Sequence, residues 1–249
     1  MKNQIILWLS SLTLVFLIGY IKNVTSKEYP ITGTFGIEGK KVSYKLDKVS
    51  FDEEFYKNII VSDIKGVRGK LIWLKNNVQY VNEFKEIDRG LECEIPILKP
   101  GQKIKYKLIL TFLNKQFEIP EKDFVTLTFW DSIPSPVSIL NFLLLYGGLL
   151  MSIRSLLEVF NRNINLNKFS VITCALFIVS IMLITPLKNS YKLGAINNFV
   201  PNLNDLIEPA LVLILFLWIV GTVFIFNKKY TTSVIITLAA VTVLLFFFV

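Results

Sequence analysis

Residues 206–226 read LIEPALVLILFLWIVGTVFIF, and this stretch decides the class of fold. After its acidic start it is apolar on every side, so a helix formed by it has no polar face to turn toward water. About 20 such residues are needed to cross the hydrocarbon core of a bilayer. The stretch therefore predicts a membrane-spanning helix rather than a buried helix of a water-soluble protein.

Four other blocks share this character and have about the same length. They are Gln4–Tyr20, Val137–Ile153, Phe169–Leu187 and Thr231–Val249. The composition agrees, because 53% of the 249 residues are hydrophobic and 18% are charged, whereas about 25% are charged in a soluble domain. We expect a membrane α-helical protein with five spans, of which the last four form a transmembrane region over residues 137–249.

The first block has two interpretations. Val24-Thr25-Ser26 resembles a small-residue cleavage site, which favours a signal peptide. However, the apolar run of Gln4–Tyr20 is longer than a usual signal core of about 7–15 residues, and Ile21-Lys22-Asn23 is poor context for processing. We favour a retained transmembrane anchor over residues 1–21, with a signal peptide as the alternative.

Residues 22–136 have a different pattern, made of short alternating segments. In Lys103–Leu108 every lysine falls on one face and every largely apolar side chain on the other, which is typical of a half-buried strand. Similar runs occur at Val42–Leu46, Leu71–Leu74, Leu91–Ile95 and Phe124–Phe129. Turn residues separate them at Gly39, Asn76-Asn77, Gly90 and Pro100-Gly101.

The length and spacing of these segments predict about seven strands in an all-β, immunoglobulin-like sandwich. A paired-cysteine framework is absent from this region, which argues against an antibody-type domain. Ser132–Pro136 ends the strand pattern and leads into the second span.

The basic residues in short loops predict the orientation. Lys2, the loop Arg154–Lys168 with Arg162, and Lys228-Lys229 fall on one side of the five spans. The other short loop, residues 188–205, has only two lysines. Because positive loops stay inside, we expect a cytoplasmic N-terminus, with the β domain and Val249 outside the cytoplasm.

Several chemistries are excluded by the amino acids that the chain lacks. It has no histidine, which removes Ser-His-Asp and Cys-His catalysis and most zinc sites. Its two cysteines, Cys93 and Cys174, lie in the β region and in an apolar block, so no disulfide or CxxC metal site is expected. The net charge is +8, but the sequence has no extended run of basic residues interleaved with aromatic residues, so we expect no nucleic-acid partner. We also expect no cofactor and no metal.

Two motifs of charged residues are candidates for function. Arg154 and Glu158 are four residues apart and can pair on one helix face, either as a functional contact inside the membrane or as an interfacial anchor of the helix, which we favour. Asp205 and Glu208 form either a cation or proton site or a near-match to a capping box at the start of the fourth span. For them we favour the cap.

Three weaker signals remain. Asn141, near the outer end of the second span, either bonds across helices or faces the headgroups. Gly147-Gly148 lacks the GxxxG spacing, which favours ordinary helix packing. Lys103, Lys105 and Lys107 form a basic strip that we interpret as a solvated strand face.

Several short motifs resemble a family of bacterial inner-membrane proteins that carry an extracytoplasmic immunoglobulin-like domain between their first two spans. The motifs are Gly69–Trp73, Gly90–Pro96, Pro100–Tyr106, Arg154-x-x-x-Glu158, Gly194-Ala195 and Asp205-Leu206-Ile207-Glu208. The chain departs from the family at Leu156, where a glycine is usual. The resemblance implies the same architecture and location, and the family has no established activity that would imply a mechanism.

These observations lead to a non-catalytic protein as the first hypothesis. It is a subunit or assembly partner of a bacterial inner-membrane complex, which meets the lipid bilayer and another membrane or periplasmic protein. The alternative is a small transporter or channel component, whose path would use the polar candidates above. An enzyme is the third hypothesis, and we do not favour it.

Overall fold

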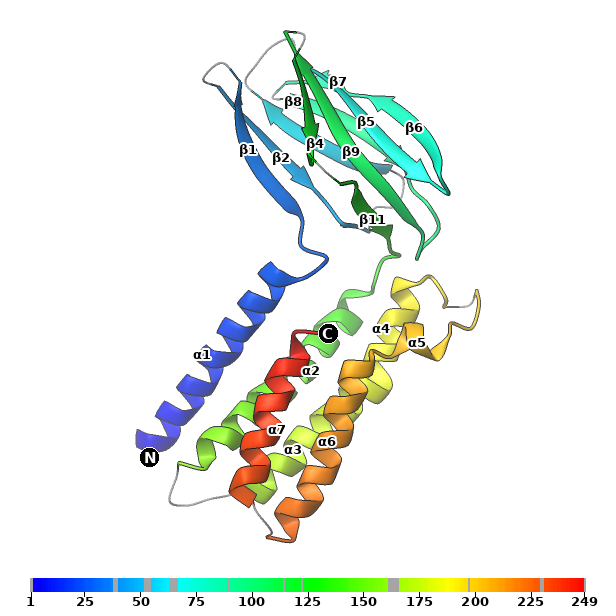
Figure 1. The fold of residues 1–249 in the computed structure, drawn as a ribbon. Coiled ribbons are helices and arrows are strands. Elements are labelled where there is room, and N and C mark those ends of the chain that lie inside the picture. Colours follow the sequence, from blue (N-terminus) through cyan, green and yellow to red (C-terminus); the bar gives the residue numbers. More distant parts are fainter. Residues whose placement is uncertain are drawn as a thin grey trace. The chain divides into compact units, whose positions relative to one another are not determined.

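The structure of the chain is a computed structural model (Figure 1). It describes residues 2–37, 40–51, 55–62, 67–88, 90–113, 115–121, 123–160, 166–196, 198–228 and 231–248. Four residues used in the predictions lie outside these ranges: Gly39, Arg162, Lys229 and Val249.

Contacts divide the chain into two compact units. The helical unit comprises Met1–Ser26, Ile133–Tyr191 and Ala195–Val249, and the β unit comprises Lys27–Ser132 and Lys192–Gly194. The β unit thus includes a three-residue segment from the second half of the chain, which the local sequence pattern did not indicate.

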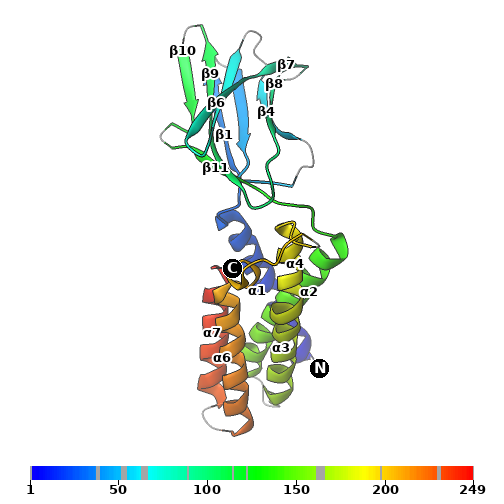
Figure 2. The same cartoon turned by 90° about the vertical axis from the view of Figure 1, so that its right-hand side faces the viewer.

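Within its described residues the helical unit has six longer α-helices and one short helix, with a π turn inside one of the spans. These elements are α1 (Lys2–Thr25), α2 (Ser135–Glu158), α3 (Leu166–Val179), the π-helix η1 (Ser180–Ile184), α4 (Thr185–Lys192), α5 (Leu203–Leu206), α6 (Pro209–Phe226) and α7 (Thr231–Phe246). Helices α2, α3, α6 and α7 run side by side in both views (Figures 1 and 2). Helix α2 packs against α1, α3 and α7.

Four stretches of this unit are long and apolar enough to cross a membrane. They are Gln4–Thr25, Ser135–Glu158, Leu166–Lys192 and Pro209–Phe226. Helix α7 is also apolar but has only 16 residues. The predicted combination of membrane-length helices with β sheets is confirmed. The fifth span stays a prediction.

The span Leu166–Lys192 continues through a proline because of the π turn. Pro186 has no backbone N–H and therefore cannot bond to the carbonyl four residues earlier. The preceding N–H, that of Thr185, bonds to the carbonyl of Ser180, five residues back. The wider turn over Ser180–Ile184 accommodates the proline without ending the helix.

Glycines allow two close helix contacts in this unit. A Cβ atom added at Gly148 of α2 would lie 2.5 Å from the ring of Phe177 on α3, and one at Gly221 of α6 would lie 2.3 Å from Leu238 of α7. At Gly147 the nearest atom would be Leu176, at an ordinary 3.6 Å. Close approach at Gly148 is therefore real, although the sequence favoured ordinary packing for this pair of glycines.

The β unit has eleven strands among its described residues. They are β1 (Ile31–Ile37), β2 (Lys40–Leu46), β3 (Val49–Ser50), β4 (Phe55–Ser62), β5 (Arg68–Lys75), β6 (Val78–Glu83), β7 (Lys85–Ile87), β8 (Gly90–Pro96), β9 (Lys103–Phe112), β10 (Lys115–Ile119) and β11 (Val125–Phe129). One sheet has the order β1-β2-β4-β8-β7. The second has the order β3-β11-β9-β5-β6, and β10 also pairs with β9.

Both sheets contribute to one hydrophobic core. Fully buried side chains such as Ile60 of β4 and Ile95 of β8 belong to the same cluster as Leu71 of β5 and Leu108 of β9. The alternation predicted for Lys103–Leu108 is confirmed, because Ile104, Tyr106 and Leu108 are buried while Lys103 and Lys105 are exposed. Two layers with alternating strands therefore enclose the core.

Two of the predicted turns carry the expected backbone. Asn76 and Asn77 both have positive φ, 50° and 64°, and they join β5 to β6, which is the geometry of a two-residue hairpin. Gly101 has a φ of 82° in the turn before β9. Gly90, by contrast, begins β8 rather than forming a turn between strands.

More strands are present than the seven predicted, for a physical reason. Strand β6 is exposed on both faces over most of its length, so it has no apolar alternation to detect. Strand β1 (ITGTFGI) is rich in glycine and threonine, which weakens the same signal. Both strands are set by pairing with a neighbour, β5 or β2, rather than by their own pattern.

Candidate functional site

A buried ion pair lies near the C-terminal end of α2. Arg154 and Glu158 form the pair expected from their spacing, and their side chains are 0% and 2% exposed. The sequence favoured an interfacial anchor, whose charged groups would reach the membrane surface. The pair instead faces the interior of the helical unit, where a charge is costly unless it is matched by a partner.

Three further side chains surround Arg154, and with Arg154 and Glu158 we call them the Arg154 cluster. Gln4 of α1 accepts a hydrogen bond from the guanidinium through its side-chain oxygen. The rings of Trp8 of α1 and Phe169 of α3 lie 5.3 and 4.8 Å from the guanidinium carbon, within the range of cation–π attraction. Three helices therefore meet around one buried charge pair.

Asn141 bonds across helices, which settles the alternatives left open by the sequence. It is 6% exposed, and its side-chain oxygen accepts a hydrogen bond of 3.0 Å from the hydroxyl of Thr185. Thr185 is the first residue of α4 and directly follows the π turn. The contact ties α2 to the far part of the Leu166–Lys192 span.

Two more polar links between helices were missed from the sequence. The indole N–H of Trp218 on α6 donates to the hydroxyl of Thr242 on α7, at 2.8 Å. Cys174 of α3 and Thr222 of α6 are 3.2 Å apart, within hydrogen-bond range. These residues lie in apolar blocks and have no distinctive spacing, so only their facing positions reveal the contacts.

The predicted capping box at Asp205 and Glu208 is wrong. Helix α6 begins at Pro209, with Glu208 at its N-cap position and without a side-chain capping bond. Asp205 lies in the short helix α5 and is exposed. Proline fits the first position of a helix, and it disfavours helical backbone in the residue before it. Glu208 accordingly has extended backbone, with φ −75° and ψ 126°, so one helix cannot run through both acids.

The candidates of the helical unit do not converge on one site. Arg154 and Asn141 are thirteen residues apart on α2, which corresponds to about 20 Å along a helix. Between them Gly148 packs tightly against Phe177, whose side chain is fully buried. Among the residues that the structure describes, no group of three Cys, Asp or Glu side chains is placed to hold a metal ion.

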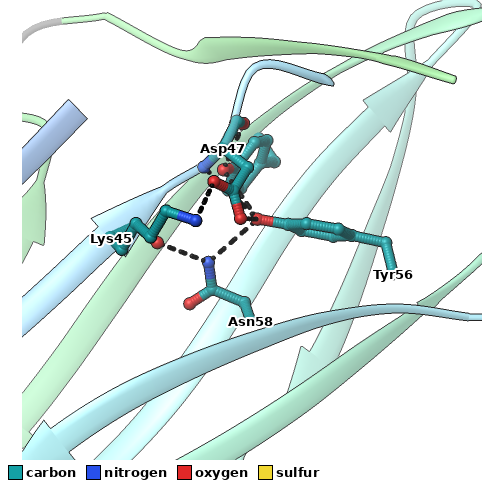
Figure 3. A network of polar contacts seen from close by, with 5 residues as sticks. Lys45, Asp47, Tyr56 and Asn58 are labelled. Atoms are coloured by element: carbon teal, nitrogen blue, oxygen red, sulfur yellow. Dashed lines mark hydrogen bonds and ion pairs between the residues drawn. The ribbon is translucent and has the colours of Figure 1, made fainter. Parts of the chain in front are cut away.

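The β unit contains a polar network that the sequence did not reveal (Figure 3). The hydroxyl of Tyr106 on β9 donates to the backbone carbonyl of Asp47, at 2.8 Å, and lies 3.2 Å from the hydroxyl of Tyr56 on β4. Asn58 of β4 donates to Tyr56 at 3.2 Å and to the carbonyl of Lys45 at 3.0 Å. Lys45 also forms an ion pair of 2.9 Å with the Asp47 carboxylate.

This network links the two sheets of the β unit. Burial raises the pKa of Tyr56, and burial together with the neighbouring Tyr56 raises the pKa of Tyr106. Both phenols therefore stay protonated at physiological pH and keep their hydrogen bonds. The bonds fix the corner between β2 and β3 to one strand of each sheet.

The two cysteines are free and buried, one in the core of each unit. Burial raises the pKa of Cys93 to about 11, which keeps it in the unreactive thiol form. The strip of lysines on β9 is partly neutralised, because Lys107 pairs with Glu118 at 2.7 Å. Neither feature has the form of a nucleophilic site.

The chain matches no known protein family, and no curated protein or solved structure is significantly similar to it. The resemblance drawn from its short motifs therefore stays a prediction. Two of those motifs do come together in the β unit, where a Cβ atom added at Gly194 would lie 3.1 Å from Pro100.

Proposed function

We propose that the protein is a non-catalytic subunit or assembly partner of a bacterial inner-membrane complex. Its N-terminus lies in the cytoplasm, and its β unit, an immunoglobulin-like sandwich, binds an extended segment of another membrane or periplasmic protein. The observation that carries this proposal is the free edge of strand β1.

Strand β1 has seven residues, ITGTFGI, without a charge or a proline. Within the described residues it pairs with β2 alone, so its outer backbone N–H and C=O groups face away from the sheet. Natural proteins usually protect such an edge with charges, proline or a bulge. An unprotected edge is suited to receive a strand from another chain.

The other edge strands of the unit differ from β1. Strand β6 carries Glu83, β7 carries Lys85 and Glu86, β10 carries Lys115 and Glu118, and β3 has only two residues. A groove of about 440 Å³ lies between β1 and β10, lined by Thr34, Gly36, Tyr44 of β2 and residues 116–121. It provides room for side chains of an added strand beside β1.

The helical unit supports a structural role for the membrane part. Its polar side chains bond to one another across the helix interfaces, as in Asn141–Thr185 and Trp218–Thr242, so they hold helices together in a bilayer. The transporter alternative would require these groups to line a continuous path. The tight contact of Gly148 with Phe177 lies between the two candidate regions and argues against that path.

Purification of the full chain from its native membrane in a mild detergent tests the proposal. We expect a partner protein to co-elute in stoichiometric amount and Thr34→Lys, at the centre of β1, to abolish co-elution. Gln79→Lys is the matched control, because it places the same charge on the exposed edge strand β6. Both variants should keep the thermal stability of the wild type to within about 0.5 kcal/mol.

Three outcomes would contradict the proposal or its site. Equal loss of the partner in both variants would move the interface away from β1. Retention of the partner in both variants would also move the interface away from β1. A homo-oligomer that lacks a partner and conducts ions in liposomes would favour the transporter alternative.

A further inference from the structure

A second pocket of the β unit gathers lysines. It has a volume of about 650 Å³ and is lined by residues from four parts of the unit, among them Lys27, Lys48 and Lys103. Among the described residues none of these three lysines forms an ion pair. The pocket therefore presents three positive charges that form no ion pair within the described part of the chain.

The sheet explains how two of these lysines come together. Strand β11 lies between β3 and β9. Its residue Thr128 is opposite Lys103 in the register with β9, and the Thr128 N–H bonds to the carbonyl of Lys48 at 2.9 Å. The hydroxyl-bearing residues Thr126 and Thr128 line the same pocket and add hydrogen-bonding capacity between the lysines.

Two carboxylates also line the pocket. Glu28 forms an ion pair of 3.0 Å with Lys192, so its charge is already matched within the β unit. Asp123 is exposed. The three lysines outnumber these acids, and the pocket keeps an excess of positive charge that suits an anion such as a phosphate group.

The chain itself limits how far this pocket lies from the membrane. The candidate span Gln4–Thr25 is about 33 Å long as a helix, enough to bring Thr25 to the surface of a hydrocarbon core of about 30 Å. Lys27 follows only two residues later and cannot be more than about 7 Å along the chain from that helix end. With Gln4–Thr25 as a membrane span, the short connection keeps Lys27 near headgroup level.

We infer that the Lys27–Lys48–Lys103 pocket binds the phosphate of an anionic lipid headgroup at the membrane surface. The lysines supply the charge, and the threonine hydroxyls supply hydrogen bonds to phosphate oxygens. Lipid binding here orients the β unit relative to the bilayer that anchors α1. This role is separate from strand addition at β1, and either one can fail without the other.

Native mass spectrometry of the full chain in neutral detergent tests this inference, with phosphatidylglycerol and phosphatidylcholine of identical acyl chains as probes. The wild type should retain phosphatidylglycerol preferentially. Each lysine near an anionic headgroup contributes about fivefold in affinity, so changing Lys27, Lys48 and Lys103 together to Gln should weaken retention on the order of 100-fold. Retention should also fall as salt rises.

The matched control changes Lys41, Lys85 and Lys115 to Gln, which removes three exposed charges of the β unit away from the pocket. This variant should retain phosphatidylglycerol as the wild type does. Equal losses in both triple variants would show a general charge effect and overturn the inference. Displacement of the lipid by glycerol phosphate at millimolar concentration would assign the pocket to a soluble phosphate instead. If the pocket triple fails to fold, Lys27→Gln alone must still give the fivefold loss.

Discussion

Arg154 is a fully buried, charged side chain in the helical unit. Its guanidinium is removed from water, and its charge is matched by Glu158 on the same helix, by the amide oxygen of Gln4 and by two aromatic faces. Such an arrangement is stable only while it is complete, because a lone buried charge loses its hydration without compensation.

Removal of one member of the pair should therefore cost more than removal of both. We expect Arg154→Gln or Glu158→Gln to lower the free energy of unfolding by about 3–5 kcal/mol. The double variant Arg154→Met with Glu158→Leu should recover most of that loss, since no buried charge remains. Thermal unfolding of the wild type, the single variants and the double variant in detergent measures this double-mutant cycle. Additive losses in the double variant would show that the two side chains do not act as a pair.

At the scale of the element, small residues and one π turn determine how the helices fit. Gly148 lets α2 approach Phe177 of α3, and the π turn over Ser180–Ile184 brings Thr185 to Asn141. A hydrogen bond thus lies at one end of the contact between α2 and the Leu166–Lys192 span, and the cation–π contact of Arg154 with Phe169 lies at the other, with tight apolar packing between them. This is the pattern of a helix interface in a bilayer, where packing and hydrogen bonds replace the hydrophobic effect.

The two adjacent glycines of α2 provide a matched test. Gly148→Ala places a Cβ atom 2.5 Å from the Phe177 ring and should destabilise the protein by about 1–3 kcal/mol through overpacking. Gly147→Ala should be neutral or slightly stabilising, because its Cβ meets only Leu176 at 3.6 Å. In the double variant Gly148→Ala with Phe177→Leu, the leucine side chain is smaller than the phenylalanine ring and should restore part of the lost stability. Thermal unfolding of the three variants decides, and equal effects at both glycines would contradict the close contact.

At the scale of the whole molecule, α1 is an integral part of the helical unit. Gln4 and Trp8 complete the Arg154 cluster, and Val15 belongs to the hydrophobic core of the unit. Cleavage after Ser26 would remove all three and leave Arg154 with fewer partners. These contacts favour the retained anchor over the signal peptide.

The mature protein should therefore keep its first helix, and intact-mass measurement after purification from the membrane should give the full-length chain. A cytoplasm-dependent reporter placed near residue 165 should be active, whereas one fused after Val249 should be inactive, if the basic loops lie inside. A mass that lacks residues 1–26 would contradict retention. Activity of the C-terminal fusion would instead overturn the five-span topology and the proposed location of the β unit.

The amino-acid sequence by itself determined the features that depend on neighbours along the chain. Apolar runs of membrane length set the helices, the alternation in Lys103–Leu108 set β9, and the four-residue spacing of Arg154 and Glu158 set their pairing. Each of these signals is contained within a few residues, because helix and strand periodicities are local. That is also why strands such as β1 and β6, which lack clear alternation, were not foreseen.

The tertiary structure alone decided which distant groups meet. The Tyr56–Tyr106 network joins strands fifty residues apart, and Gln4 reaches Arg154 across 150 residues of chain. The start of α6 was misjudged for a subtler reason, since the restriction that Pro209 imposes on Glu208 outweighed an attractive capping pattern. The pairing of strands, the contacts between side chains of different elements and the formation of pockets depend on the register between elements. No local sequence pattern determines that register.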